Sequence, residues 1–196
     1  MQRDVQLIVE DELSGFVLRK LVELSGKGLS VYGVLSMGGF GNIKNQIPRF
    51  KNASNVIPHI ILTDLDTCDC APRLMKDWDI DSVQKNLLFR VAVREVEAWL
   101  LADRQGIADY LGLPLAKIPL HPEHETDPKQ TLLNLVRKCK RRRLIVELVP
   151  AAGSSASIGP LYNSRMGDFV RDRWDMQRAM VNSDSLSRAV NRISAL

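Results

Sequence analysis

The chain has 196 residues, of which 45% are hydrophobic and 26% charged, with a net charge of +4. This composition provides material for a core and excludes an extended disordered chain, while the mild positive charge permits a nucleic-acid partner without requiring one. Three cysteines give no disulfide framework, and neither a signal peptide nor an apolar run of roughly 20 residues is evident, so we expect a cytoplasmic protein without membrane spans.

Short apolar runs alternate with helical patterns through the first half of the chain. Such alternation implies crossover connections and a mostly parallel sheet that is covered on both faces. We therefore predict an α/β core over residues 1–103. The predicted strands are 5–9, 29–35, 59–63 and 87–93, and the predicted helices are 12–24, 42–50, 72–78 and 95–102.

The second half has a helical pattern without further strands. Asp127-Pro128 is a typical helix start, with aspartate as the N-cap and proline in the first turn. We predict a helical appendage over residues 104–196, packed on the core. Its predicted helices are 107–111, one from Asp127 into a basic run, 167–180 and 186–196.

Acidic residues follow three of the predicted strands. Glu10 follows the first, Asp64 and Asp66 end the third, and Glu95 and Glu97 follow the fourth. The carboxyl ends of parallel strands share one edge of a sheet, where ligands bind, and two residues spaced by two in an extended chain point to the same side. Convergent carboxylates are ligands for Mg²⁺ or Mn²⁺. We therefore predict a divalent metal site at this edge.

Each acid also has a purely structural interpretation. Glu10 could be a solvated residue that opens a helix, where negative charge suits the helix dipole. Asp64-Leu65-Asp66 could form a turn with side-chain hydrogen bonds to the backbone. Glu95 and Glu97 could pair with Arg94 or Arg90 on a helix surface. The metal site is favoured because all three groups fall on one predicted edge.

The order of these acids resembles the Toprim pattern of topoisomerases and primases. In that fold, a glutamate after the first strand and an Asp-x-Asp after the third bind Mg²⁺ for phosphoryl transfer on nucleic acid, which matches Glu10, Asp64 and Asp66. The chain is more closely similar to a Toprim-like bacterial family, domain of unknown function 4276. The similar blocks are ILTDLDTCDCAPRL at 61–74, VAVREVEAWLLAD at 91–103, DPKQTLLNL at 127–135 and GPLYNSRMGDFV at 159–170.

The resemblance implies a metal-dependent nuclease. It also implies an ATPase partner, because members of this family are often encoded beside an ATPase. Such a two-protein system could act in defence against phages. Toprim proteins commonly carry glycine after the first glutamate and a further acid a few residues later. Here Asp11 and Ser14 occupy those places, so we expect Glu97, or less readily Glu95, to supply the missing acid.

Two other motifs carry less chemistry. Cys68 and Cys70 with His121 and His124 have spacings tighter than those of standard zinc sites, so we do not expect zinc. The glycines of residues 38–41 lack the Lys-Ser/Thr of a P-loop, and a plain turn is the better interpretation.

Six cations fall within seven positions at the end of the helix predicted from Asp127. Compensation of a helix dipole would need fewer, so an anionic partner is as reasonable as a solubility role. Lys129, near the start of the same helix, is a candidate for neutralising transition-state charge, and a surface role is equally reasonable. The candidate nucleic-acid contacts in this basic run are Arg137, Lys138, Lys140, Arg141, Arg142 and Arg143.

These features together predict a metal-dependent phosphoryl-transfer enzyme, a nuclease or related nucleic-acid processing protein. Glu10, Asp64 and Asp66 are the predicted metal ligands, and Glu97 completes the shell or acts as a base. The alternative is a non-catalytic interaction subunit of an ATPase-containing complex. Exposed apolar surface on the last helices would favour that alternative, and an acidic crevice with a metal would favour the enzyme.

Overall fold

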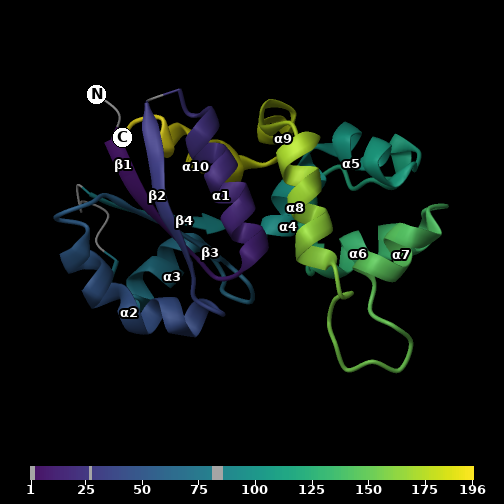
Figure 1. The fold of residues 1–196 in the computed structure, drawn as a ribbon, viewed down its shortest axis with the longest axis horizontal. Helices are drawn as coiled ribbons and strands as arrows, with labels where there is room; N and C mark the ends of the chain where they lie inside the picture. The colour runs from purple at the N-terminus through teal and green to yellow at the C-terminus, as the bar shows by residue number, and fades with distance from the viewer. Residues whose placement is uncertain (1–2, 27, 81–85) are drawn as a thin grey trace. The chain divides into compact units, whose positions relative to one another are not determined.

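A computed structural model describes residues 3–26, 28–80 and 86–196 (Figure 1). Within these residues four strands form one sheet in the order β2-β1-β3-β4, and each pair of neighbouring strands is parallel. The predicted α/β class with a parallel sheet is therefore confirmed. The strands are β1 (Arg3–Val9), β2 (Leu29–Ser36), β3 (His59–Asp64) and β4 (Leu87–Ala92).

The chain divides into two compact units, residues 1–93 with 185–196, and residues 94–184. The sequence had predicted a single boundary at residue 103, after the helix that follows β4. In the structure that helix, α4 (Val96–Ala102), belongs to the second unit, where all its residues are buried and it packs against α6 and α9. The last helix belongs instead to the first unit, where the Ser185 hydroxyl accepts a hydrogen bond from the amide of Val93 at 3.2 Å.

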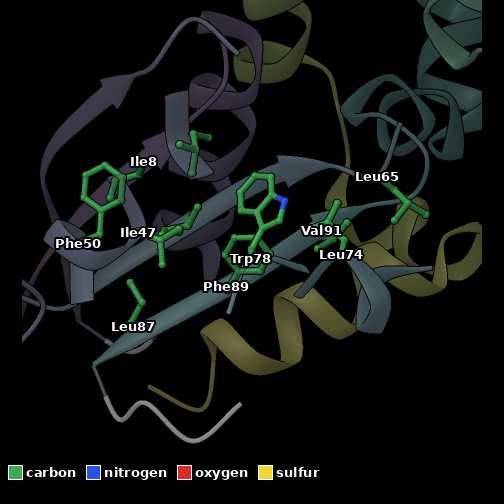
Figure 2. Close-up of a cluster of buried hydrophobic side chains, with 11 residues drawn as sticks. Ile8, Ile47, Phe50, Leu65, Leu74, Trp78, Leu87, Phe89 and Val91 are labelled. Carbon is green, nitrogen blue, oxygen red and sulfur yellow. The ribbon is translucent and has the colours of Figure 1, made fainter. Parts of the chain in front are cut away.

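One face of the sheet is covered by α2 (Phe40–Ala53) and α3 (Ala71–Asp77). Alternate residues of the strands, including Ile8, Phe89 and Val91, point to this face and pack against the two helices (Figure 2). Trp78, just after α3, packs edge-on against Phe89 with 5.5 Å between ring centroids. This cluster anchors the strands whose carboxyl ends carry the acidic residues.

The opposite face is covered by α1 (Glu12–Leu24), which packs against β1, β2 and β3. The helix begins at a side-chain cap, because Asp11 accepts a hydrogen bond from the Ser14 amide at 2.8 Å. Its buried face includes Val17, Leu18 and Leu21. The final helix, α10 (Asp184–Ile193), lies on the same side of the sheet as α1 (Figure 1).

The second unit is helical in all of its regular elements, as the sequence predicted for the region after the sheet. Its helices after α4 are α5 (Arg104–Leu111), α6 (Pro128–Lys138), α7 (Arg142–Leu148), α8 (Tyr162–Asp172) and α9 (Met176–Asn182), with short 3₁₀ turns at Leu115–Lys117 and Pro122–His124.

One helical prediction in this unit is wrong, and one helix was not predicted. The predicted helix 167–180 is two helices, α8 and α9, because the chain turns at Trp174 and Asp175. The indole of Trp174 is buried and donates to the carbonyl of Trp99 at 3.1 Å, and Asp175 starts α9 by capping the amide of Arg178. The helix that the sequence did not predict is α7, which begins inside the basic run.

Within the described residues, no helix combines the length and the apolar character needed to cross a bilayer.

Candidate functional site

The carboxyl ends of β1 and β3 bring Glu10 and Asp64 together. The two strands pair in parallel, with Val9 opposite Leu62, so Glu10 lies beside Thr63. The Oε1 atom of Glu10 accepts hydrogen bonds from the Thr63 hydroxyl and, at 2.8 Å, from the backbone amide of Asp64. The predicted convergence of these two positions at one edge is therefore seen in the structure, through the backbone of Asp64.

The environment of Glu10 combines burial with negative charge. Burial raises the pKa of this carboxyl above its ordinary value, and the charges of Asp66 and Asp11 raise it further. The hydrogen bonds from Thr63 and from the Asp64 amide lower the pKa, in opposition. Glu10 is half-buried and bonded, so it is not the solvated helix-opening residue of the alternative interpretation; Asp11 caps α1 instead.

Asp66 lies near this edge in a backbone conformation that differs from the predicted one. The expected same-side arrangement of Asp64 and Asp66 requires an extended chain, but Asp66 lies in a turn with a φ of 48°. The amide of Cys68 closes the turn on the carbonyl of Leu65 at 3.0 Å, and Leu65 is buried between the two acids. Asp66 is exposed, and its charge still acts on Glu10.

The segment between β2 and α2 closes on the backbone of Glu10. The amides of Gly38 and Gly39 donate to the carbonyl of Glu10 at 2.8 and 3.2 Å. These amides are therefore committed to a turn and do not form a phosphate cradle, which agrees with the plain-turn interpretation. Gly39 has a φ of 122°, which a residue with a side chain rarely adopts, so the turn requires glycine there.

The side chains at this edge offer the type of ligand atom, carboxylate oxygen, that hard divalent ions bind. Carboxylate oxygens suit Mg²⁺ or Mn²⁺, and Mg²⁺ commonly uses one or two protein carboxylates while water and substrate phosphate complete its shell. Across residues 3–26, 28–80 and 86–196, no group of three or more His, Cys, Asp or Glu side chains is arranged to hold an ion by itself. The three-ligand site of Glu10, Asp64 and Asp66 therefore stays a prediction.

Glu97 and Glu95 belong to the second unit, where both approach Lys129. Glu97 is buried and accepts a hydrogen bond from the Tyr162 hydroxyl at 2.9 Å, while the Lys129 ammonium lies 3.5 Å from the same Oε1 atom. Glu95 accepts from the Lys129 amide at 2.9 Å. Lys129 is therefore paired with these acids, and the catalytic role of Glu97 stays a prediction.

The basic run bridges α6 and α7. Arg137 and Lys138 lie in the last turn of α6, where cations suit the helix dipole. Arg142 and Arg143 lie in the first turn of α7, where positive charge opposes the dipole. Dipole compensation therefore accounts for only part of the run, and Arg141, Arg142 and Arg143 are all exposed.

Comparison with known proteins gives little. No family model and no curated protein matches the chain. Among solved structures, the C-terminal region of the Burkholderia pseudomallei OLD protein is similar to it with 17% identity and a TM-score of 0.42, over 97% of each chain. A likeness this distant identifies neither a fold family nor an activity. The similarity to domain of unknown function 4276 accordingly stays an expectation.

Several partners in these sites escape prediction from sequence. Thr63 precedes Asp64 in a buried strand and gives no sign of bonding Glu10. Tyr162 lies in the block at 159–170 that resembles the family, yet nothing in that block indicates a hydrogen bond to Glu97. The register of β1 on β3 would have identified Thr63, because it places residue 63 beside residue 10.

Proposed function

We propose that the edge formed by Glu10, Asp64 and Asp66 binds Mg²⁺ or Mn²⁺ and that the protein catalyses phosphoryl transfer on a nucleic acid, as a nuclease or related processing enzyme. The observation that carries the proposal is the hydrogen bond from the Asp64 amide to Glu10 Oε1, which joins the acidic ends of two parallel strands. Parallel α/β sheets bind ligands at this edge.

Glu10 is prepared for a cation by its surroundings. Its Oε1 atom is held by Thr63 and by the Asp64 amide, and Oε2 accepts no hydrogen bond from any described residue. The raised pKa shows that the ionised form is disfavoured without a compensating charge. A nearby divalent ion would supply that charge and hold Glu10 in its ionised form.

Asp64 and Asp66 would act with Glu10 as oxygen ligands on either side of the buried Leu65. Leu65 anchors the segment, and its amide continues the ladder by donating to the carbonyl of Ala92 at 2.9 Å. When bound, the ion would polarise the scissile phosphate and lower the pKa of an attacking water. The chain's own contribution is to orient the Glu10 carboxylate before substrate arrives.

The basic run supports nucleic acid as the substrate. Arg141, Arg142 and Arg143 are exposed, and cations in this density bind phosphate backbones without reading sequence. The alternative, an interaction subunit for an ATPase, depended on apolar surface of the last helices. On α10, Leu186, Val190 and Ile193 are buried in the protein's own core. Val181 on α9 is exposed, but it is a single apolar side chain and not a patch, so we retain the enzyme as the proposal.

The test is cleavage of labelled single- and double-stranded DNA and RNA by the purified chain, with Mn²⁺ or with a chelator. We expect cleavage only with the metal, and a loss of several orders of magnitude in Asp64→Asn. Asp69→Asn is the matched control, because Asp69 is an exposed acid of the same segment and pairs with Arg73.

The same assay is repeated with the ATPase encoded nearby, where one is present, because a partner could be required for activity. Cleavage that is unaffected in both Asp64→Asn and Asp66→Asn, with and without the partner, would reject the metal enzyme and favour the interaction subunit.

A further inference from the structure

A hollow of about 670 Å³ lies within the second unit, between α5, α7 and α8. Four arginines line it: Arg141 and Arg143 from the basic run, and Arg165 and Arg173 from α8 and the residue after it. Its volume is in the range of ligand sites, which span roughly 300–1,000 Å³. The hollow is therefore large enough, and its lining cationic enough, to bind an anion.

Two of the arginines are fixed by one carboxylate. Glu147 accepts from Arg143 Nε at 2.8 Å, and from Arg165 through Nε at 2.7 Å and Nη2 at 2.9 Å. The fork-to-fork pairing with Arg165 restrains both side chains. Because Glu147 is buried and the Arg165 side chain is only partly exposed, the guanidinium of Arg165 is ordered in advance of any ligand.

The other two arginines keep donors for a ligand. Arg141 Nη1 donates to the carbonyl of Tyr110 at 2.9 Å, which uses one of the five N–H donors of its guanidinium. Arg173 is exposed, and its side chain forms no hydrogen bond or ion pair with the residues that the structure describes. These two residues come from different elements and face the same hollow.

The charge of the lining indicates the kind of anion. Four arginines stand against three carboxylates, Glu147, Asp168 and Asp172, which leaves one net positive charge. A phosphodiester carries one negative charge, and guanidinium forks match the geometry of its oxygens. The aromatic residues of the lining, Tyr110 and Phe169, are buried and pack against each other with 4.9 Å between ring centroids, so the exposed part of the lining is mainly charged side chains.

We propose that this hollow binds a phosphodiester group of a nucleic-acid strand, independently of base sequence, with Arg141 and Arg173 as the principal ligands. The choice of a nucleic acid rests on the proposed function. The basic run alone does not imply this site, because Arg173 lies outside the run and Arg142, inside it, does not line the hollow.

A cation outside both the hollow and the basic run provides the control. Lys117 is exposed in the second unit and does not line the hollow. Binding of a labelled single-stranded DNA to the full chain is measured in chelator at several salt concentrations, for Arg141→Gln, Arg173→Gln and Lys117→Gln. Each lost phosphate contact lowers the steepness of log K against log salt by about 0.7 for a single strand. We expect that reduction for Arg141→Gln and Arg173→Gln, and little change for Lys117→Gln. Thermal unfolding confirms that each variant folds.

The proposal is overturned if Arg173→Gln leaves the slope unchanged, if all three variants change it equally, or if the wild type does not bind DNA. Inorganic phosphate is the competing probe. If it displaces the DNA when its concentration equals that of the DNA phosphate groups, the hollow is a site for a free anion instead. Because binding is measured without metal, the result is independent of the cleavage test. If a variant loses DNA binding in chelator but the protein still cleaves with metal, or if it binds DNA but does not cleave, the phosphate site and the metal enzyme are judged separately.

Discussion

The Oε1 atom of Glu10 lies 2.8 Å from the backbone nitrogen of Asp64, which joins two acidic positions that are 54 residues apart in the chain. The same oxygen accepts the hydroxyl of Thr63, a residue that is 1% exposed. The carboxylate of Glu10 is thus oriented by β3 rather than by its own strand. Orientation of this kind makes the position useful for holding an ion.

Replacing Thr63 by valine should raise the pKa of Glu10 further. The hydroxyl stabilises the ionised carboxylate and lowers its pKa, and valine has nearly the same shape without that donor. The pKa is measured by NMR titration of the metal-free protein. An unchanged or lower value in Thr63→Val would mean that the hydroxyl does not act on Glu10.

Glu147 should contribute to stability in a defined pH window. Hydrogen bonds from Arg165, and then from Arg143, lower the pKa of Glu147 from 4.5 to about 2. A carboxyl with a depressed folded pKa stabilises the fold above its unfolded pKa, and that stabilisation is lost as the pH falls toward the folded value. The difference in unfolding free energy between wild type and Glu147→Gln should therefore be constant from pH 7 to about 5 and shrink between about pH 4.5 and 2. A difference independent of pH would contradict the pairing.

Asp103 should be a major stabilising residue of the second unit. Its carboxylate is fully buried and accepts from the amides of Gly106 and Asp175 and from two nitrogens of Arg178. Asp103→Ala leaves these donors without their acceptor and should lower the unfolding free energy by roughly 3 kcal/mol. Asp109→Ala is the control, an exposed acid on the same helix, with an expected change within about 0.5 kcal/mol. Equal effects in chemical denaturation would contradict the account.

The parallel sheet and the shared edge of Glu10 and Asp64 could be predicted because both follow from short-range patterns. Apolar runs of strand length alternate with amphipathic helices, and that alternation fixes the strand direction. The cap of α1 was not predicted, although Asp11 directly precedes the helical pattern. Asp66 was misplaced because spacing by two carries meaning only in extended backbone, and its φ of 48° ends the strand.

Features stabilised by distant contacts could not be predicted. α7 has seven residues, begins with arginines and has no side-chain cap, so its sequence carries little helical signal. It is held by tertiary bonds, since the amides of Gly159 and Leu161 donate to the carbonyls of Leu148 and Glu147 at 2.9 Å each. The arginine-lined hollow is formed in part by this helix, so the hollow could not be predicted from the sequence either.

The most direct test of the central claim is the binding of Mn²⁺ to the full chain, measured by calorimetry and by electron paramagnetic resonance. We predict that the wild type binds the ion and that affinity falls as the pH is lowered through the raised pKa of Glu10, because protonation removes a ligand. Glu10→Gln with Asp64→Asn should abolish binding, while Asp69→Asn should retain it. Binding of Mn²⁺ that is undiminished in the double variant would contradict the claim that this edge is a metal site.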